Sequence, residues 1–431
     1  MRDRLLIASL WLLAQGKFYY VLYGWHDHLK PLAPGWVMIL KDLAIVLLLL
    51  YCRRPITQAL RENRFLRILT LLALAITAIS ALHLTRLPAS DWLQHYGRNV
   101  LVPLFFIPVG YHLLKLRESR FFFDCFLICA ALNTAVAVLT YLLAPDRLFG
   151  GRAMGLMENP ITLAGVLGPA VVIALVFGMT EKTPKRQLGY LTLCVASCAG
   201  LAMTASLTYI AIAPLLFGLF ALQNPRMKQA FAAIGAIALL GAMVIQSMSL
   251  ISQPQAAQRQ VAIGDYSLDA RIQRLMVSPK AENSVNARLD GYRLLGEFLT
   301  EAPLVEVLFG RFSLPHYAKF DSMAVGLIFN VGVVGFALYL LLFFIPILIA
   351  IRTRRELKAG WPRMALDFCI LGIAAFLLSG TANNNSYRFP LNIIVYLQIG
   401  MILRFARELG IDSTPRFRQA EPFTLEGAAA C

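Results

Sequence analysis

Charged residues are scarce in this chain, and long stretches of it contain none. Asp, Glu, Lys and Arg make up 15% of the 431 residues, hydrophobic types make up 58%, and the mean hydropathy is +0.65. Since soluble domains carry about 25% charged residues, this scarcity excludes an ordinary soluble protein. Apolar runs such as 43–51, 68–82 and 121–143 lack a polar face, and with their flanks each supplies the roughly 20 residues that cross a hydrocarbon core. The sequence therefore predicts an all-α polytopic membrane protein.

Cysteine is absent from the one long polar segment of the chain, residues 251–322. This absence excludes a disulfide within that segment. The seven cysteines lie elsewhere, and four of them form the i,i+4 pairs Cys125/Cys129 and Cys194/Cys198. Neither pair has one of the six histidines beside it, so we interpret both pairs as helix-packing residues and expect no metal site there.

Twelve apolar segments are predicted to span the membrane, and one long loop interrupts them late. Residues 1–250 would hold the first nine spans, 251–322 the loop, 323–405 the last three spans, and 406–431 a tail. A loop this long is seldom needed only to connect two helices, so it is the first place to look for chemistry. The predicted spans lie near residues 5–24, 36–52, 66–84, 99–114, 121–143, 161–180, 188–203, 206–222, 230–250, 323–349, 364–380 and 390–405.

Basic residues follow every second span, and this alternation predicts the orientation. Most of the 40 Lys and Arg residues lie before the first predicted span or after the even-numbered ones. The positive-inside rule then places those connections and both termini in the cytoplasm, and the long loop outside, in the periplasm. The net charge of +16 is accordingly attributed to topology and to anionic lipid headgroups, and no nucleic-acid partner is expected.

Arginine recurs in the predicted outward connections, against the general charge trend. Its planar guanidinium suits bidentate recognition of phosphate or carboxylate, although a single outward arginine also serves to cap a helix or meet a lipid headgroup. Charges inside the predicted spans include Lys41 and Asp42 in the second span and Asp124 near the cytoplasmic end of the fifth, and for Lys41 both snorkelling and a functional role are open. The candidates for binding an anion are Arg152, Arg288, Lys41 and Arg98.

An amphipathic helix is predicted within the long loop, over residues 284–302. Arg288 lies next to its apolar stripe, and Pro303 ends the run. A few residues before the tenth span stand His316 and Asp321, either of which could act as a general base. The residues that recur at helical spacing are Val285, Leu289, Tyr292, Leu295 and Phe298.

Three motifs resemble a known family in their order along the chain. Arg152-Ala-Met-Gly155-Leu-Met-Glu-Asn159-Pro160-Ile-Thr-Leu-Ala164 resembles the Arg-x-x-Gly-x-x-x-Asn-Pro-x-x-Leu-Ala signature of the O-antigen ligase and polymerase superfamily. The segment from Ser284 to Arg288, followed by Tyr292 and by Phe309-Gly310, is similar to the arginine-bearing periplasmic helix of that family. The run from Asp321-Ser322 to Gly332-Val-Val-Gly335 is similar to its His-Asn-x-x-Leu to Gly-x-x-Gly span entry.

The resemblance implies a metal-independent, inverting membrane glycosyltransferase that needs no cofactor. It would transfer a glycan from undecaprenyl diphosphate at the periplasmic face of the bacterial inner membrane. The acceptor would be the lipid A–core oligosaccharide in a ligase, or another lipid-linked repeat unit in a polymerase. Arg152 and Arg288 would bind the diphosphate, with Lys41 and Arg98 as further candidates, and His316 or Asp321 would activate the acceptor.

Two departures from the family pattern bear on the catalytic residues. Counted back from Gly332, the family histidine falls on Asp321, with Ser322 at the asparagine position, and His316 stands five residues earlier. Phe309-Gly310-Arg311 also lacks the second glycine of the usual Phe-Gly-x-Gly turn. Either His316 is displaced by a small insertion, or Asp321 has taken over its role.

Two alternatives to a ligase stay open at this point. Twelve spans are also common in secondary transporters and lipid-glycan flippases, which would line their spans with charges, whereas these spans have few. A polymerase of O-antigen or exopolysaccharide is the closer alternative. The single dominant outward loop favours the ligase, because polymerases have two large loops, while the Asp321-Ser322 replacement favours the polymerase.

Overall fold

The chain forms a bundle of long helices. The computed structural model describes residues 2–14, 25–26, 30–31, 35–143, 152–157, 159–223, 283–313, 320–358, 360–385 and 391–411. In this part of the chain the only strands are β1 (Trp25–His26) and β2 (Lys30–Pro31), an antiparallel pair. Six of the described helical segments are long and apolar enough to cross a membrane: Leu43–Glu62, Arg64–Thr85, Leu116–Leu143, Pro160–Thr180, Met323–Glu356 and Trp361–Gly380.

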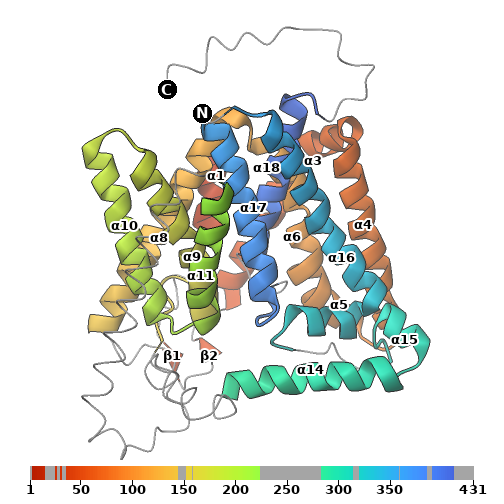
Figure 1. The fold of residues 1–431 in the computed structure, drawn as a ribbon. Coiled ribbons are helices and arrows are strands. Elements are labelled where there is room, and N and C mark those ends of the chain that lie inside the picture. Colours follow the sequence, from red (N-terminus) through yellow and green to blue (C-terminus); the bar gives the residue numbers. More distant parts are fainter. Residues whose placement is uncertain are drawn as a thin grey trace, which may run out of the picture.

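These six segments bear out the prediction of a helical membrane protein, while the number of twelve spans stays a prediction. Figure 1 shows the long helices side by side, with α14 lying across one end of the bundle. The described helices are α1 (Arg2–Ala14), α3 (Gly35–Glu62), α4 (Arg64–Ser80), η1 (Ala81–Thr85), α5 (Ala89–Trp92), η2 (Leu93–Leu101), α6 (Val102–Leu104), α7 (Phe106–Leu113), α8 (Leu116–Leu143), α9 (Pro160–Thr180), α10 (Pro184–Met203), α11 (Leu207–Gln223), α14 (Asn283–Glu301), α15 (Leu304–Phe309), α16 (Met323–Glu356), α17 (Trp361–Gly380) and α18 (Leu391–Glu408).

Several predicted boundaries coincide with helix ends. The break predicted between the spans 188–203 and 206–222 separates α10 from α11. The ninth predicted span, 230–250, lies outside the described residues. Large apolar side chains on the outer faces of the long helices are exposed, among them Leu71 on α4 and Leu348 on α16. A helix whose exposed face is apolar is suited to lipid, because the acyl chains replace water as its solvent.

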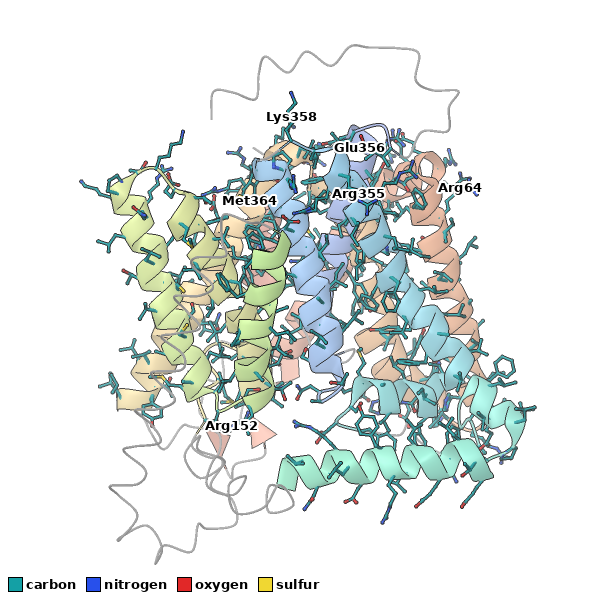
Figure 2. All side chains as sticks on the ribbon, viewed as in Figure 1. Arg64, Arg152, Arg355, Glu356, Lys358 and Met364 are labelled. Atoms are coloured by element: carbon teal, nitrogen blue, oxygen red, sulfur yellow. The ribbon has the colours of Figure 1, made fainter. Side chains whose placement is uncertain are left out.

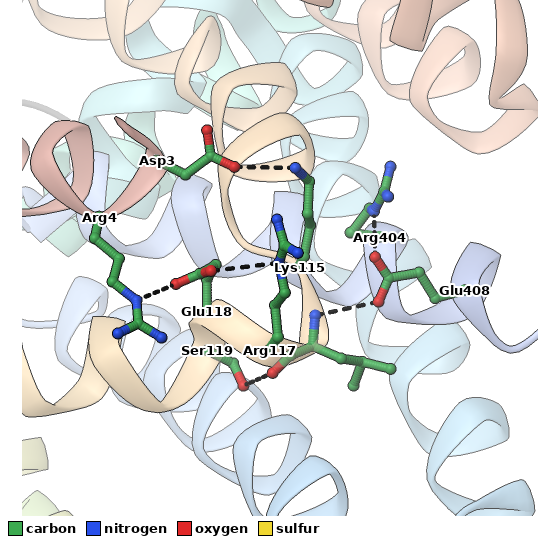
Figure 3. A network of polar contacts seen from close by, with 9 residues as sticks. Asp3, Arg4, Lys115, Arg117, Glu118, Ser119, Arg404 and Glu408 are labelled. Atoms are coloured by element: carbon green, nitrogen blue, oxygen red, sulfur yellow. Dashed lines mark hydrogen bonds and ion pairs between the residues drawn. The ribbon is translucent and has the colours of Figure 1, made fainter. Parts of the chain in front are cut away.

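Polar contacts gather at the end of the bundle where α1 begins, which we call the terminal end (Figure 3). Lys115 Nζ lies 2.9 Å from Asp3 Oδ2, and the backbone N–H of Leu116 donates to Glu408 Oε2 at 3.1 Å. The connection between α7 and α8 thus holds the start of α1 and the end of α18 together. Figure 2 shows Arg64, Arg355 and Lys358 at this terminal end, and Arg152 at the opposite end, which we call the α14 end.

A buried ion pair near the terminal end was not anticipated from the sequence. Asp367 of α17 is 0% exposed and accepts a hydrogen bond from Arg354 Nε of α16. A carboxylate inside an apolar helix is tolerated when a cation on the neighbouring helix compensates it. Asp124, predicted near the cytoplasmic surface, lies 3.3 Å from Arg120 Nε on the same helix.

Helix α16 is not the single uninterrupted span predicted over 323–349. Its backbone leaves the helical conformation at Gly332, with φ of 71°, and Gly310 after α15 has φ of 96°. A Cβ on Gly332 would stand 2.2 Å from the carbonyl oxygen of Leu308, and one on Gly310 would stand 2.5 Å from that of Asn330. Both positions therefore require glycine, for conformation and for space.

The carbonyls released by this break find donors within the protein. The backbone N–H of Arg311 donates to the carbonyl of Phe329 at 2.7 Å, and His83 Nε2 donates to the carbonyl of Asn330 at 2.7 Å. Such partners are required, because irregular backbone inside an apolar span is tolerated only where its polar groups are satisfied. We call the packing of residues 308–311 against 329–332, with His83, the glycine interlock.

Replacing Gly332 with alanine is expected to destabilise the folded protein. Gly332 has φ of 71° and ψ of 180°, a conformation almost confined to glycine that costs another residue roughly 1–3 kcal/mol, and the new methyl group would also overlap the carbonyl of Leu308. Thermal unfolding of the purified protein in detergent should show a clearly lower midpoint for Gly332→Ala. The matched control is Gly296→Ala on α14, where nothing lies within 4 Å of the added Cβ. An unchanged midpoint for Gly332→Ala would contradict the interlock.

Candidate functional site

Helix α14 coincides with the amphipathic helix predicted over 284–302, and two residues of its apolar stripe are buried against the bundle. Leu295 and Phe298 are buried against Val325, Ile328 and Phe329 in the first part of α16. The rings of Phe298 and Phe329 are stacked, with their centroids 4.6 Å apart. The helix thereby lies flat across the α14 end of the molecule (Figure 1). Its orientation is fixed by Leu295 and Phe298, while Leu289, Leu294 and Leu299 on the same helix are exposed.

The hydroxyl of Tyr292 joins three elements at this end. It donates to the carbonyl of Thr381, just after α17, at 2.8 Å, and lies 3.1 Å from Ser322 Oγ. Since a tyrosine hydroxyl has one proton, the Ser322 hydroxyl must be the donor in the second contact. Ser322 Oγ also caps α16 by accepting from the backbone N–H of Val325 at 3.5 Å. Tyr292 therefore ties α14 to the start of α16 and the end of α17.

This contact brings two of the predicted site residues into the same region. Asp321 directly precedes Ser322 and is exposed, and Arg288 lies one helical turn before Tyr292 on α14, half-buried. Residues four apart on a helix are neighbours on one side, so Arg288 and Tyr292 face the same part of the bundle end. A guanidinium and an exposed carboxylate thus flank one polar surface, where the first can bind an anion and the second can accept a proton.

A run of polar residues after α17 supports this surface and was missed from the sequence. Asn384 Nδ2 donates to the carbonyl of Phe320 at 3.2 Å, which fixes the residue before Asp321. Asn385 is buried and donates to Ser379 Oγ and to the carbonyl of Phe376. The signal was present, since a run of asparagine and hydroxyl residues following an apolar span is unusual in composition.

Arg152 lies at the same end of the molecule but in different surroundings (Figure 2). It is 8% exposed, and its Nε donates to the carbonyl of Thr204 at 2.7 Å. The neighbouring Ala153 donates its backbone N–H to the carbonyl of Met203 at 2.9 Å. Arg152 and Ala153 therefore attach the segment before α9 to the turn between α10 and α11, a structural role alongside the predicted binding one.

Other residues of the Arg152 motif have local structural roles. Gly155 has φ of 59°, and a Cβ there would stand 2.9 Å from Asn133 Oδ1. That same oxygen accepts the backbone N–H of Leu156 at 2.9 Å, joining the segment to α8. Asn159 caps α9 by accepting from the backbone N–H of Thr162 at 2.9 Å, and Pro160 occupies the first turn. The described residues of the motif therefore join the segment 152–157 to α8 and begin α9.

The remaining predicted site residues have less structural context. Lys41 lies in α3 and Arg98 in η2, but their side chains are outside the described part of the chain. His316 also lies outside the described residues, so Asp321 is the candidate base whose surroundings are visible. Among the described residues no three His, Cys, Asp or Glu side chains gather closely enough to hold a metal ion.

No protein-family model matches the chain, and no curated protein matches its sequence.

Replacing Tyr292 with phenylalanine is expected to loosen α14 while the bundle stays folded. The change removes two hydrogen bonds that join elements distant in sequence, and a typical intramolecular hydrogen bond contributes roughly 1 kcal/mol. Amide hydrogen exchange of 283–301 should become faster in Tyr292→Phe, since local opening becomes cheaper. Tyr141→Phe on α8, where the tyrosine is exposed, is the control. Equal exchange in both variants would show that the hydroxyl does not hold the helix.

Proposed function

We propose that this protein is an O-antigen ligase, a glycosyltransferase that moves O-polysaccharide from undecaprenyl diphosphate to the lipid A–core oligosaccharide. The observation that carries the proposal is the α14 end, where the helix that carries Arg288 is joined by Tyr292 to Ser322, the residue after Asp321, at the entry of α16. The order of the three sequence motifs supports the superfamily, and the single large loop favours a ligase over a polymerase. The α14 end would face the periplasm, since Arg64, Arg355 and Lys358 lie at the other end.

The position of the site suits a lipid-linked donor. A diphosphate attached to a polyprenyl chain sits at the membrane surface while its tail remains in the hydrocarbon. Arg288 on a helix lying across the bundle end would meet that diphosphate at the level where it resides. Guanidinium groups bind phosphate oxygens through paired hydrogen bonds, and Arg152, Lys41 and Arg98 are the further candidates for this role.

The proposed step exchanges one carbon–oxygen bond for another. A hydroxyl oxygen of the acceptor attacks the anomeric carbon, while the bond from that carbon to the diphosphate oxygen breaks. The electron pair leaves with undecaprenyl diphosphate, and the anomeric configuration inverts. The hydroxyl proton passes to Asp321 or to His316. Catalysis then consists of holding the two substrates in line and compensating the negative charge that grows on the leaving group.

Replacing Arg288 with alanine is expected to abolish most glycan transfer without unfolding the protein. Removal of a group that stabilises developing charge lowers turnover by roughly 10²–10³-fold. The measurement is transfer of glycan from undecaprenyl diphosphate to purified lipid A–core by the reconstituted protein, resolved on gels. Arg293→Ala is the matched control, because Arg293 lies on the same helix, is exposed and pairs with Glu297 at 3.5 Å. It should transfer glycan at the normal rate.

The assignment fails if Arg288→Ala and Arg152→Ala both retain full transfer in this assay. Because Arg152 also holds the turn at Thr204, its variant is interpretable only if its unfolding midpoint is unchanged.

A deletion strain separates the ligase from the polymerase. Loss of glycan on lipid A with intact lipid-linked polymer indicates a ligase, whereas lipid A capped by single repeats indicates a polymerase.

A further inference from the structure

We infer that α15, although part of the segment between the spans, contacts the acyl chains of the bilayer leaflet at the α14 end. The partner is phospholipid, and the contact surface consists of Leu304 and Val305 together with Leu82 and Leu84 of η1. This lipid contact would fix the height of α14 relative to the membrane. It is separate from the proposed glycan transfer, since none of these four residues belongs to the candidate site.

The exposed side of α15 is apolar. Leu304 is 71% exposed and Val305 is 56% exposed. The only charged residue of the helix, Glu306, is buried on its inner side. A short helix facing water would place its charge outward and its leucine inward, so this arrangement is inverted for water and suited to lipid.

This surface continues the lipid-facing side of the adjacent span. Leu82 and Leu84 are exposed and lie within the membrane-crossing segment Arg64–Thr85. Between them His83 donates to the carbonyl of Asn330 in the glycine interlock, which places η1 beside the end of α15. Figure 1 shows α15 at the outer edge of the bundle, next to the end of α4 and to α16. Further along these helices Leu71 and Leu348 are exposed in the same way.

The depth of α15 follows from the interlock independently of side-chain exposure. The N–H of Arg311, two residues after α15, binds the carbonyl of Phe329, which belongs to the membrane-crossing segment Met323–Glu356. The backbone of Leu308 also lies against Gly332 in that segment. The end of α15 therefore lies at the level of Phe329, near the start of that segment, and the exposed apolar side chains of α15 and η1 favour lipid at this level.

Fluorescence quenching by agents in the hydrocarbon and in water tests this lipid contact. Leu304→Cys would carry a small environment-sensitive label in the full-length protein, reconstituted in phosphatidylethanolamine and phosphatidylglycerol nanodiscs. Lipids with a nitroxide on the acyl chain quench from the hydrocarbon, and iodide quenches from water. Thr300→Cys on α14 is the water-facing control, and Leu341→Cys, exposed on α16, is the lipid-facing one. In the background, serine replaces Cys194 and Cys198, the described cysteines that are not buried, and Cys431, which lies outside the described residues.

The label at Leu304 is expected to be quenched by the nitroxide lipid severalfold more than the label at Thr300, and close to the label at Leu341. Iodide should give the opposite order. Quenching at Leu304 that matches Thr300 with both agents would overturn the inference. Val305→Cys provides a second reading at the neighbouring exposed position if the Leu304 variant does not fold. Glycan transfer is not measured in this experiment, so its outcome does not depend on the proposed function.

Discussion

The glycine interlock is the constraint on which the α14 end depends. Gly310 and Gly332 let two backbones approach to a distance that no side chain would permit, and the released carbonyls are bound by His83 and by the N–H of Arg311. This contact fixes α15 against the break in α16. Tyr292 then joins α14 to Ser322 at the start of α16. The position of Arg288 on α14 therefore depends on how the first part of α16 is held by the interlock.

The helices could be predicted from the sequence because apolarity along a run is a local property. The predicted break at 204–206 and the predicted helix over 284–302 depend only on turn residues and on helical spacing, and both occur in the structure. The break at Gly332 could not be predicted in this way. A glycine within an apolar run is compatible with a continuous or a broken helix, and what decides is the contact with Leu308, 24 positions earlier in the chain.

The residues of the candidate site stay a prediction, while the contacts around them could not be predicted from local patterns. Helical spacing predicts the helix that carries Arg288, and α14 occurs over those residues. The hydroxyl of Tyr292, however, binds partners 30 and 89 positions away, and no local pattern encodes that contact. Asp367 was overlooked for a similar reason, since its compensating Arg354 belongs to another helix. In both cases a polar group inside an apolar region is explained only by the tertiary structure that satisfies it.

The two candidate arginines differ in what their surroundings allow. Arg152 is buried and already holds the carbonyl of Thr204, so removing it would disturb the connection to α9 as well as any bound phosphate. Arg288 lies half-buried on a helix across the bundle end. Its replacement would disturb the fold less and would mainly remove a positive charge. A diphosphate anchored by a polyprenyl tail has a fixed height at the membrane surface. In the proposed function, the interlock and the proposed lipid contact of α15 would hold Arg288 at the level of that diphosphate.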